Sequence, residues 1–213
     1  MSQLIELASS KGSSSEERLL LREFAHRISN EFASAISVIS LAAARSGNDE
    51  VKAALAAAED RLQNYAQVHQ ALRMPEHGGL VDAGAYLRQL CRAISRSRLD
   101  VKSIELVLVD RPLRMNSHCC WRLGMIVSEL IINSARHAFR ESGGVIRVEL
   151  RSSQSFVECR VTDNGTAAAN ICRGHGLEIV EALAKGLDGK IDQQCGPQGA
   201  RTVVTFPLGP EAS

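Results

Sequence analysis

The stretch REFAHRISNEFASAISVISL, residues 22–41, decides the N-terminal part of the fold. Apolar residues recur along it at spacings of three, four and seven, which predicts one helix with an apolar stripe. His26 lies roughly opposite this stripe, with Arg27 beside it and Asn30 one turn further on. The imidazole can act as a nucleophile near pH 7, and Arg27 and Asn30 could hold an incoming phosphoryl group. Taken alone, a histidine in this position is more often a plain surface residue.

The composition argues against several classes of function. A chain of 213 residues suffices for one or two domains, and its net charge of +1 gives no general case for binding nucleic acid or an anionic membrane. No apolar run reaches membrane-spanning length, and residues 1–10 lack a secretory signal pattern, so we expect a cytoplasmic protein. None of the six cysteines belongs to a C-x-x-C pair, so we expect buried free thiols and no metal site.

The first predicted boundary lies before the quoted stretch. Residues 1–15 are expected to form an N-terminal arm that ends in the flexible sequence KGSSS at 11–15. Ser14, followed three positions later by Glu17, makes a capping box. The sequence therefore predicts that the helix begins near Glu16.

Residues 16–74 are predicted to form a helical hairpin. The first helix ends near residue 45, Gly47 is suited to a left-handed helix cap, and a second helix with heptad-like apolar spacing runs over residues 49–73. A short loop between two such helices predicts an antiparallel arrangement. Because their apolar stripes cannot both be covered within one chain, we expect a homodimer that forms a four-helix bundle.

The sequence PEHGG at residues 75–79 breaks this pattern and precedes a second domain, residues 80–209. Asp82 is expected to cap the first helix of this domain. The remaining elements are expected as a strand over 104–109, a helix over 117–139, strands over 145–150 and 156–162, a helix over 174–185, and strands near 190–193 and 202–206. This order predicts an α/β sandwich with helices on one face of a mixed sheet, and an α+β fold for the whole chain.

Polar side chains follow one another along the helix predicted at 117–139. Glu129, Asn133, Arg136 and His137 share one helix side at spacings of four, three and one. A carboxylate and an amide oxygen in line can hold Mg²⁺, while Arg136 can face phosphate. A solvated helix face explains the same pattern if it stands alone.

Two glycine-containing stretches complete the set of candidate sites. Asp163 and Gly165 directly follow a strand, where the aspartate can accept a hydrogen bond from an amine and the glycine lets the backbone approach a flat ring. Gly174 and Gly176 open a helix, where free N–H groups form an anion cradle. Each motif alone is weak, because Asp-Asn-Gly is a common turn and Gly-x-Gly is short.

The order and spacing of these motifs resemble the histidine kinases of two-component signalling. His26-Arg27-Ile28-Ser29-Asn30 resembles the His-Arg-x-x-Asn phosphoacceptor motif of a type kin to the HWE kinases. ELIINSARHAF at 129–139 resembles the N-box of the family, and VTDNG at 161–165 its first glycine box. GHGLEIVEALAKGLDGKI at 174–191 resembles the second glycine box, and GARTVVTFPL at 199–208 the closing strand.

The resemblance implies a dimerisation hairpin followed by an ATP-binding domain of the kind shared with gyrase and heat-shock chaperones. By the resemblance, His26 accepts the phosphoryl group, Asn133 holds Mg²⁺ and Asp163 contacts adenine. Gly174 and Gly176 face the phosphates.

Three departures from the family pattern weaken the predicted ATP site. Ala167 stands at an expected glycine, and the loop between Gly165 and Gly174 has only eight residues, 166–173. Ala200 stands where the closing strand usually has threonine, which removes a hydroxyl from the network around Asp163. A fourth departure is Val-Thr-Asp at 161–163 in place of the Trp-x-Glu of HWE kinases proper.

Three functions remain open at this point. The first is a protein-histidine kinase that phosphorylates His26 with ATP and Mg²⁺ and passes the group to an aspartate of a response-regulator receiver domain. The second is a histidine phosphotransferase that relays phosphoryl groups between receiver domains without ATP. The third is a non-catalytic scaffold that docks response regulators. No sensor domain is visible in the sequence, so we also expect a separate sensor protein as a partner.

Overall fold

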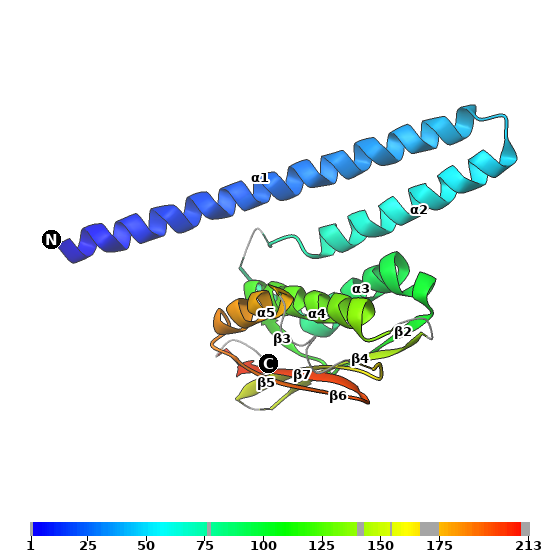
Figure 1. Ribbon diagram of the computed structural model, residues 1–213. Helices are drawn as coiled ribbons and strands as arrows, with labels where there is room; N and C mark the ends of the chain where they lie inside the picture. The colour runs from blue at the N-terminus through cyan, green and yellow to red at the C-terminus, as the bar shows by residue number, and fades with distance from the viewer. Residues whose placement is uncertain (1, 76–77, 140–142, 154, 167–174, 210–213) are drawn as a thin grey trace. The chain divides into compact units, whose positions relative to one another are not determined.

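Two compact units make up the chain, Met1–Arg73 and Met74–Ser213. The computed structural model describes residues 2–75, 78–139, 143–153, 155–166 and 175–209. In the described residues, the first unit is helical and the second combines helices with a β-sheet (Figure 1). This arrangement confirms the predicted α+β fold.

The first unit is an antiparallel hairpin of two helices, α1 (Ser2–Arg45) and α2 (Asp49–Ala71). Asn48 caps α2, because its side chain accepts hydrogen bonds from two backbone N–H groups of the first turn. Helix α1 runs through the KGSSS sequence, so the helix start predicted near Glu16 is wrong. One glycine costs a helix about 1 kcal/mol, which does not by itself end a long helix. Gly47 does not adopt the predicted left-handed conformation.

The apolar side chains of α1 fall into two groups. One group is half-buried against α2 and includes Ile28, Phe32 and Ile36. The other group stays exposed in the single chain, and Phe24 and Val38 are 64% and 65% exposed. Leu20 and Leu41 are also exposed, as is Val51 of α2. The N-terminal part of α1 extends past the end of α2 (Figure 1).

A five-stranded sheet forms one layer of the second unit. The strand order is β2 (Ile104–Val109), β4 (Gly144–Ser152), β5 (Phe156–Asp163), β7 (Gly199–Pro207) and β6 (Lys190–Gly196). Strand β2 pairs parallel with β4, and the other pairs are antiparallel. The sheet is therefore mixed, as predicted.

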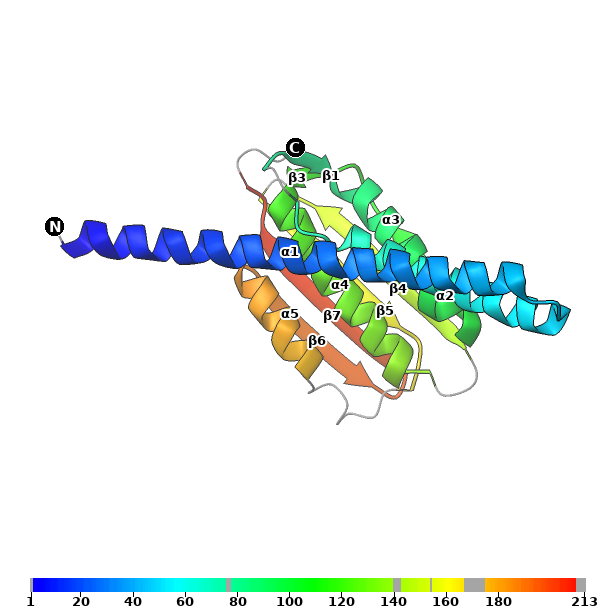
Figure 2. The ribbon, with the colours of Figure 1, turned by 90° about the horizontal axis from the view of Figure 1, so that it is seen from above.

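Three helices cover one face of this sheet, as Figures 1 and 2 show from two directions. They are α3 (Ala83–Ile94), α4 (Ser117–His137) and α5 (His175–Lys185). Asp82 caps α3 by accepting a hydrogen bond from the N–H of Ala85 at 2.9 Å, as predicted. The short ribbon of β1 (Leu80–Asp82) and β3 (Arg114–Asn116), the π-helix Ser95–Leu99 and the 3-10 turn Asp100–Lys102 were not predicted.

The core lies between the helices and the sheet. Along β4 and β5 every second side chain is buried, which is the pattern of strands with one covered face. Ile146, Val148 and Leu150 of β4 are buried on this face, and α4 contributes the buried residues Leu123 and Ile126. This packing fixes α4 over the sheet and thereby positions the polar residues of its last turns.

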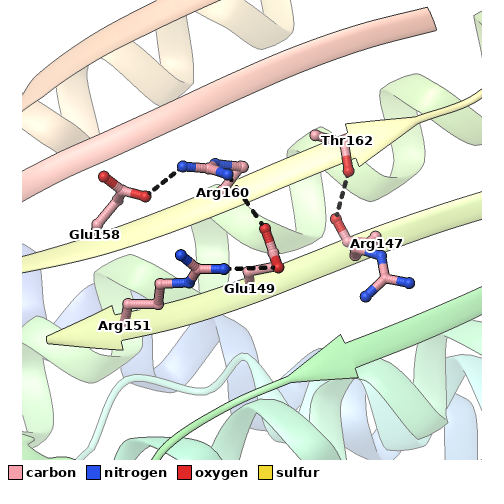
Figure 3. Close-up of polar contacts among 6 residues, drawn as sticks. All are labelled: Arg147, Glu149, Arg151, Glu158, Arg160 and Thr162. Carbon is pink, nitrogen blue, oxygen red and sulfur yellow. Dashed lines mark hydrogen bonds and ion pairs between the residues drawn. The ribbon is translucent and has the colours of Figure 1, made fainter.

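The other face of the sheet carries a network of charged side chains (Figure 3). Glu149 of β4 pairs with Arg151 at 3.3 Å and with Arg160 of the neighbouring strand β5 at 3.5 Å. Arg160 also pairs with Glu158 at 2.8 Å, and the Thr162 hydroxyl donates to the carbonyl of Arg147. These cross-strand pairs give β4 and β5 a polar face opposite the core.

Among the described residues, four cysteines are free thiols, and three of these, Cys91, Cys120 and Cys159, are buried. Burial raises the pKa of each of these three thiols to about 12. Cys195 is disulfide-bonded, so the expectation of free thiols is wrong for it. Within the described ranges, none of the helices combines the length and the apolar character needed to cross a membrane.

Candidate functional site

His26 lies on the exposed side of α1, as predicted. Its Nδ1 is 3.2 Å from Nδ2 of Asn30, which stands one helical turn further along. The carboxamide of Asn30 can be turned about its axis so that its oxygen accepts from Nδ1–H, because N and O of an amide have nearly the same shape. Asn30 therefore holds one nitrogen of the ring and leaves Nε2 directed away from that contact.

Arg27, also exposed, is engaged elsewhere. Its Nε donates to Oε1 of Glu23 at 2.9 Å, one turn back along α1. An exposed ion pair of this kind is weak and readily exchanged. Arg27 thus follows His26 in the sequence, and in the structure its guanidinium is paired with the carboxylate of Glu23.

Helices α4 and α5 bring Glu129 and Asn133 of the polar motif on α4 next to Gly176 of the predicted anion cradle. A side chain built at Gly176, in the first turn of α5, would collide with Oε1 of Glu129 and lie 2.5 Å from Nδ2 of Asn133. Glu129 and Asn133 are half-buried, one turn apart on α4, and both reach the start of α5. A side chain at position 176 would therefore have to displace the ends of the Glu129 and Asn133 side chains.

Arg136 and His137 occupy the last turn of α4, and both side chains are exposed. They do not share the half-buried position of Glu129 and Asn133. The position predicted for Gly174 lies outside the described residues, as does Ala167.

Asp163, the last residue of β5, is buried with 8% of its surface exposed. Its Oδ1 accepts hydrogen bonds from the backbone N–H of Gly165 at 3.1 Å and of Ala200 at 3.2 Å. Its Oδ2 accepts from the hydroxyl of Ser134 on α4 at 2.7 Å. Three donors thus fix the carboxylate at the point where β5, β7 and α4 meet.

The loop after β5 packs closely onto the end of α4. A Cβ at Gly165 would collide with the carbonyl of Ala138, and the N–H of Thr166 donates to the same carbonyl at 3.0 Å. Asn164 turns back to β4, where its Oδ1 accepts from the N–H of Val145 at 2.7 Å. Gly165 thus allows the loop after β5 to pack onto the end of α4.

An open hollow with a volume of about 430 Å³ adjoins Asp163. It is lined by Thr162 and Asp163 at the end of β5 and by residues 194–201 of the β6–β7 hairpin. Gly199 in this hairpin has φ of +119°, and a Cβ there would collide with the carbonyl of Asp163. The hairpin can therefore lie close to the aspartate only with glycine at this position.

Asn133 and Glu129 have the donor chemistry that Mg²⁺ requires. Both present oxygen atoms, and they lie side by side next to Gly176. Among the described residues, no cluster of three or more histidine, cysteine, aspartate or glutamate side chains could hold a metal ion. Mg²⁺ commonly binds through one or two protein ligands plus phosphate oxygens and water, and this pair fits that mode.

Ser134 and the N–H of Ala200 are parts of the site that the sequence patterns missed. Ser134 directly follows Asn133, but nothing in the sequence links position 134 to an aspartate 29 residues later. Ala200 was expected to weaken the aspartate network by lacking a hydroxyl. The structure shows that its backbone N–H still donates to Asp163 and that a hydroxyl arrives from α4.

Comparisons with solved structures agree on the fold. The histidine kinase domain of the blue-light-activated kinase EL346 from Erythrobacter litoralis is similar with a TM-score of 0.59 and 21% identity. The alignment covers 92% of this chain and 94% of that domain. Full-length ShkA in complex with AMPPNP is similar with a TM-score of 0.56 and 18% identity, over 91% of this chain and 46% of that one.

Curated relatives are similar in sequence over most of this chain. Sensor histidine kinase PdtaS of Mycolicibacterium smegmatis is 28% identical over 207 residues, covering 89% of this chain and 40% of that protein. Blue-light-activated histidine kinase 2 of Erythrobacter litoralis is 28% identical over 204 residues, covering 88% of this chain and 57% of that protein. This chain thus spans about half the length of these relatives or less.

Two family models match the chain in succession. The model described as histidine kinase matches residues 23–98, which include His26, the rest of α1, all of α2 and α3 of the second unit. The model described as histidine kinase-like ATPase domain matches residues 84–206, more than half of the chain. Because the two matches follow one another in the order of the two structural units, the chain belongs to the histidine kinase family, with a helical hairpin followed by a histidine kinase-like ATPase domain.

Proposed function

We propose that this protein is an ATP-dependent histidine kinase of two-component signalling that phosphorylates His26 and passes the phosphoryl group to a receiver-domain aspartate. The observation that carries the proposal is the Asp163 site. A carboxylate with three hydrogen-bond donors lies at the end of β5. On the same helix α4, one residue from the serine that binds this carboxylate, stands Asn133, which faces the start of α5.

The nucleotide would be held by groups of α4, α5 and β5. Asp163 accepts a hydrogen bond from the amine of adenine, and the N–H groups at the start of α5, with Gly174 and Gly176, face the phosphates. Asn133, with Glu129 beside it, would hold Mg²⁺, which would supply positive charge to neutralise the phosphates. Arg136 and His137, exposed on the last turn of α4, are free to contact the phosphates or the sugar. Gly165 keeps the loop after Asp163 close to the ring.

The transfer step uses the free nitrogen of His26. The Nε2 lone pair forms a bond to the γ-phosphorus of ATP while the bond from that phosphorus to the β–γ bridging oxygen breaks, and ADP leaves. Asn30 holds Nδ1–H through its carboxamide oxygen, which keeps Nε2 unprotonated and stabilises the positive charge that develops on the ring. Arg27 exchanges its pairing with Glu23 for the incoming phosphoryl group.

The receiver aspartate would then attack the phosphoryl group on His26, and the bond from phosphorus to Nε2 breaks. A response-regulator receiver domain is therefore the proposed protein partner. The exposed apolar residues of α1 and α2 support a homodimer through the hairpin.

The intact network around Asp163 favours the kinase over the phosphotransferase, since a decayed ATP domain has no need for a fixed buried carboxylate. Titration calorimetry with Mg-ATP tests this choice. The expected dissociation constant is on the order of 0.1–1 mM, a free energy near −4 to −5.5 kcal/mol. Asp163→Ala and Asn133→Ala should each remove detectable binding, because each deletes a directional contact worth about 1.5–3 kcal/mol.

The departure at position 167 provides the second arm of the test. Ala167→Gly should tighten binding of Mg-ATP, because it removes a β-carbon where the backbone is expected to come close to the nucleotide. If neither the wild type nor this variant binds Mg-ATP, the kinase proposal falls, and His26 must receive its phosphoryl group from a receiver aspartate.

A further inference from the structure

The Ser134 hydroxyl is a part of the nucleotide site to which no role has been assigned. It donates to Oδ2 of Asp163 at 2.7 Å, the shortest of the three hydrogen bonds to this carboxylate. Ser134 is half-buried on α4, next to Asn133, and Asp163 is buried. This bond therefore joins the helix that would carry Mg²⁺ to the strand that would carry the adenine contact.

We propose that Ser134 is a specificity-determining and positioning residue, which makes the site select a purine with an amino group at position 6 over one with an oxo group. The inference rests on the proposed binding of ATP at Asp163. It adds to that proposal the residue that orients the aspartate and the chemical distinction that the orientation produces.

The carboxylate of Asp163 has a limited number of positions that can accept a hydrogen bond. A carboxylate oxygen offers two lone pairs, and a hydroxyl offers one proton and two lone pairs. Both positions on Oδ1 of Asp163 are taken by the N–H groups of Gly165 and Ala200. On Oδ2 one position is taken by Ser134, and no second donor to this oxygen is found among the described residues, so one position remains for a ligand.

The hydroxyl of Ser134 has a single proton to donate. Because Ser134 gives its proton to Asp163, its oxygen can only accept a further hydrogen bond. Asp163 and Ser134 together thus present acceptors alone to a ligand. An exocyclic amine can donate to them, whereas an oxo group would bring another acceptor against them and leave polar groups unpaired. A site discriminates strongly against a ligand when binding of that ligand would leave buried polar groups without hydrogen-bond partners.

The register of β5 and β7 brings position 200 close to Asp163. Thr162 of β5 pairs with Arg201 of β7, so Asp163 and Ala200 occupy the next positions on neighbouring strands. Directly paired residues have their Cβ atoms about 4.5–5.5 Å apart, close enough for a hydroxyl at position 200 to reach the carboxylate. In the part of the chain that the structure describes, Ser134 is the one side-chain donor to Asp163. A hydroxyl that donates to Asp163 could thus come from position 200 on β7 or from α4, and in this protein Ser134 of α4 supplies it.

Calorimetric binding of Mg-ATP and Mg-ITP by the full chain tests the inference. These two nucleotides differ at one edge of the purine: adenine has a 6-amino group beside an unprotonated N1, whereas hypoxanthine has a 6-oxo group beside N1–H. The wild type should bind ATP about tenfold more tightly than ITP, a difference of one well-placed hydrogen bond. Ser134→Ala should weaken ATP binding about five- to tenfold and leave ITP binding nearly unchanged, so that the ratio between the nucleotides approaches one.

Two further variants separate this role from a general structural one. Ser128→Ala removes another buried serine of α4 that does not bind Asp163, and it should keep the wild-type ratio. Ala200→Thr added to Ser134→Ala should restore the preference for ATP, because it returns a hydroxyl to the carboxylate from β7. The thermal midpoints of all variants are measured alongside.

The outcomes are distinguishable from failure of the proposed function. Loss of affinity for both nucleotides in equal measure, or an unchanged ratio in Ser134→Ala, would overturn the role of Ser134 while ATP binding stands. Absence of a preference for ATP in the wild type would also overturn it. A wild type that binds neither nucleotide contradicts this inference and the proposed ATP-dependent activity together.

Discussion

At the scale of single residues, the polar groups of both units are arranged in short, specific contacts. His26 contacts Asn30 on the outside of a helix, and Asp163 is held by three donors in the interior. The sequence identified His26, Asn30 and Asp163 because each belongs to a local motif. It could not identify Ser134, since its contact to Asp163 exists only once α4 lies on the sheet.

Replacement of Asn30 tests the contact to His26. Asn30→Ala should slow phosphorylation of His26 about tenfold, because the ring loses the hydrogen bond that holds Nδ1. The melting temperature should change little, since Asn30 is exposed. The initial rate of acid-labile labelling measures the effect, and Ser34→Ala, an exposed change on the same helix, is the matched control. An undiminished rate in Asn30→Ala would show that the contact has no part in the transfer.

Gly176 provides a second test at this scale. A methyl group at this position would collide with the ends of the Glu129 and Asn133 side chains, which can shift, so Gly176→Ala should destabilise the second unit by about 1 kcal/mol or less. It should also lower Mg-ATP affinity at least about tenfold, because it displaces Asn133. Calorimetry and thermal unfolding measure both effects. Gly47→Ala, where nothing lies within 4 Å of the new methyl group, is the control. Equal behaviour of the two variants would contradict the close approach of α4 and α5.

At the scale of elements, the sequence predicted what periodicity can encode. The long amphipathic helix α4 and the alternating strands β4 and β5 were placed within two residues at most boundaries. The ribbon of β1 and β3 was missed because each strand has only three residues, too few for an alternation to stand out. The start of α1 was misplaced because glycine and serine were weighted as helix breakers, although a continuing helix can include them.

The pKa of His69 makes the stability of the hairpin depend on pH. Burial on α2 lowers this pKa below its ordinary value, and the positive charge of Arg73 lowers it further. The unfolded chain then binds more protons than the folded chain at pH values between the two pKa values, so stability falls as pH drops through that window. The thermal midpoint of the hairpin should decrease between about pH 7.5 and about pH 5.5.

His69→Gln should remove this part of the pH dependence, because glutamine does not titrate. Circular dichroism of the helices at the two pH values measures it. A wild type whose midpoint is equal at both values, or a variant that keeps the full decrease, would contradict the assignment to His69.

At the scale of the whole molecule, the exposed apolar residues of the hairpin predict a dimer. Val38 and Leu41 are 65% and 51% exposed in the single chain. Val38→Asp combined with Leu41→Asp should raise the dimer dissociation constant at least about tenfold, because burying a charge in place of an apolar side chain costs several kcal/mol. Light scattering at micromolar concentration measures the mass, and Ser37→Asp, an exposed polar position nearby, is the control. A wild type that is strictly monomeric would contradict the proposed bundle.

The predicted division of labour between a phosphoacceptor hairpin and a nucleotide domain depends on one event, the transfer of a phosphoryl group to His26. Incubation of the full chain with γ-labelled ATP and Mg²⁺, followed by mapping of the acid-labile label, measures it most directly. The account predicts label on His26 in the wild type and in His69→Ala, and none in His26→Ala. A wild type that binds Mg-ATP but takes up no label, or a label that persists in His26→Ala, would contradict the account.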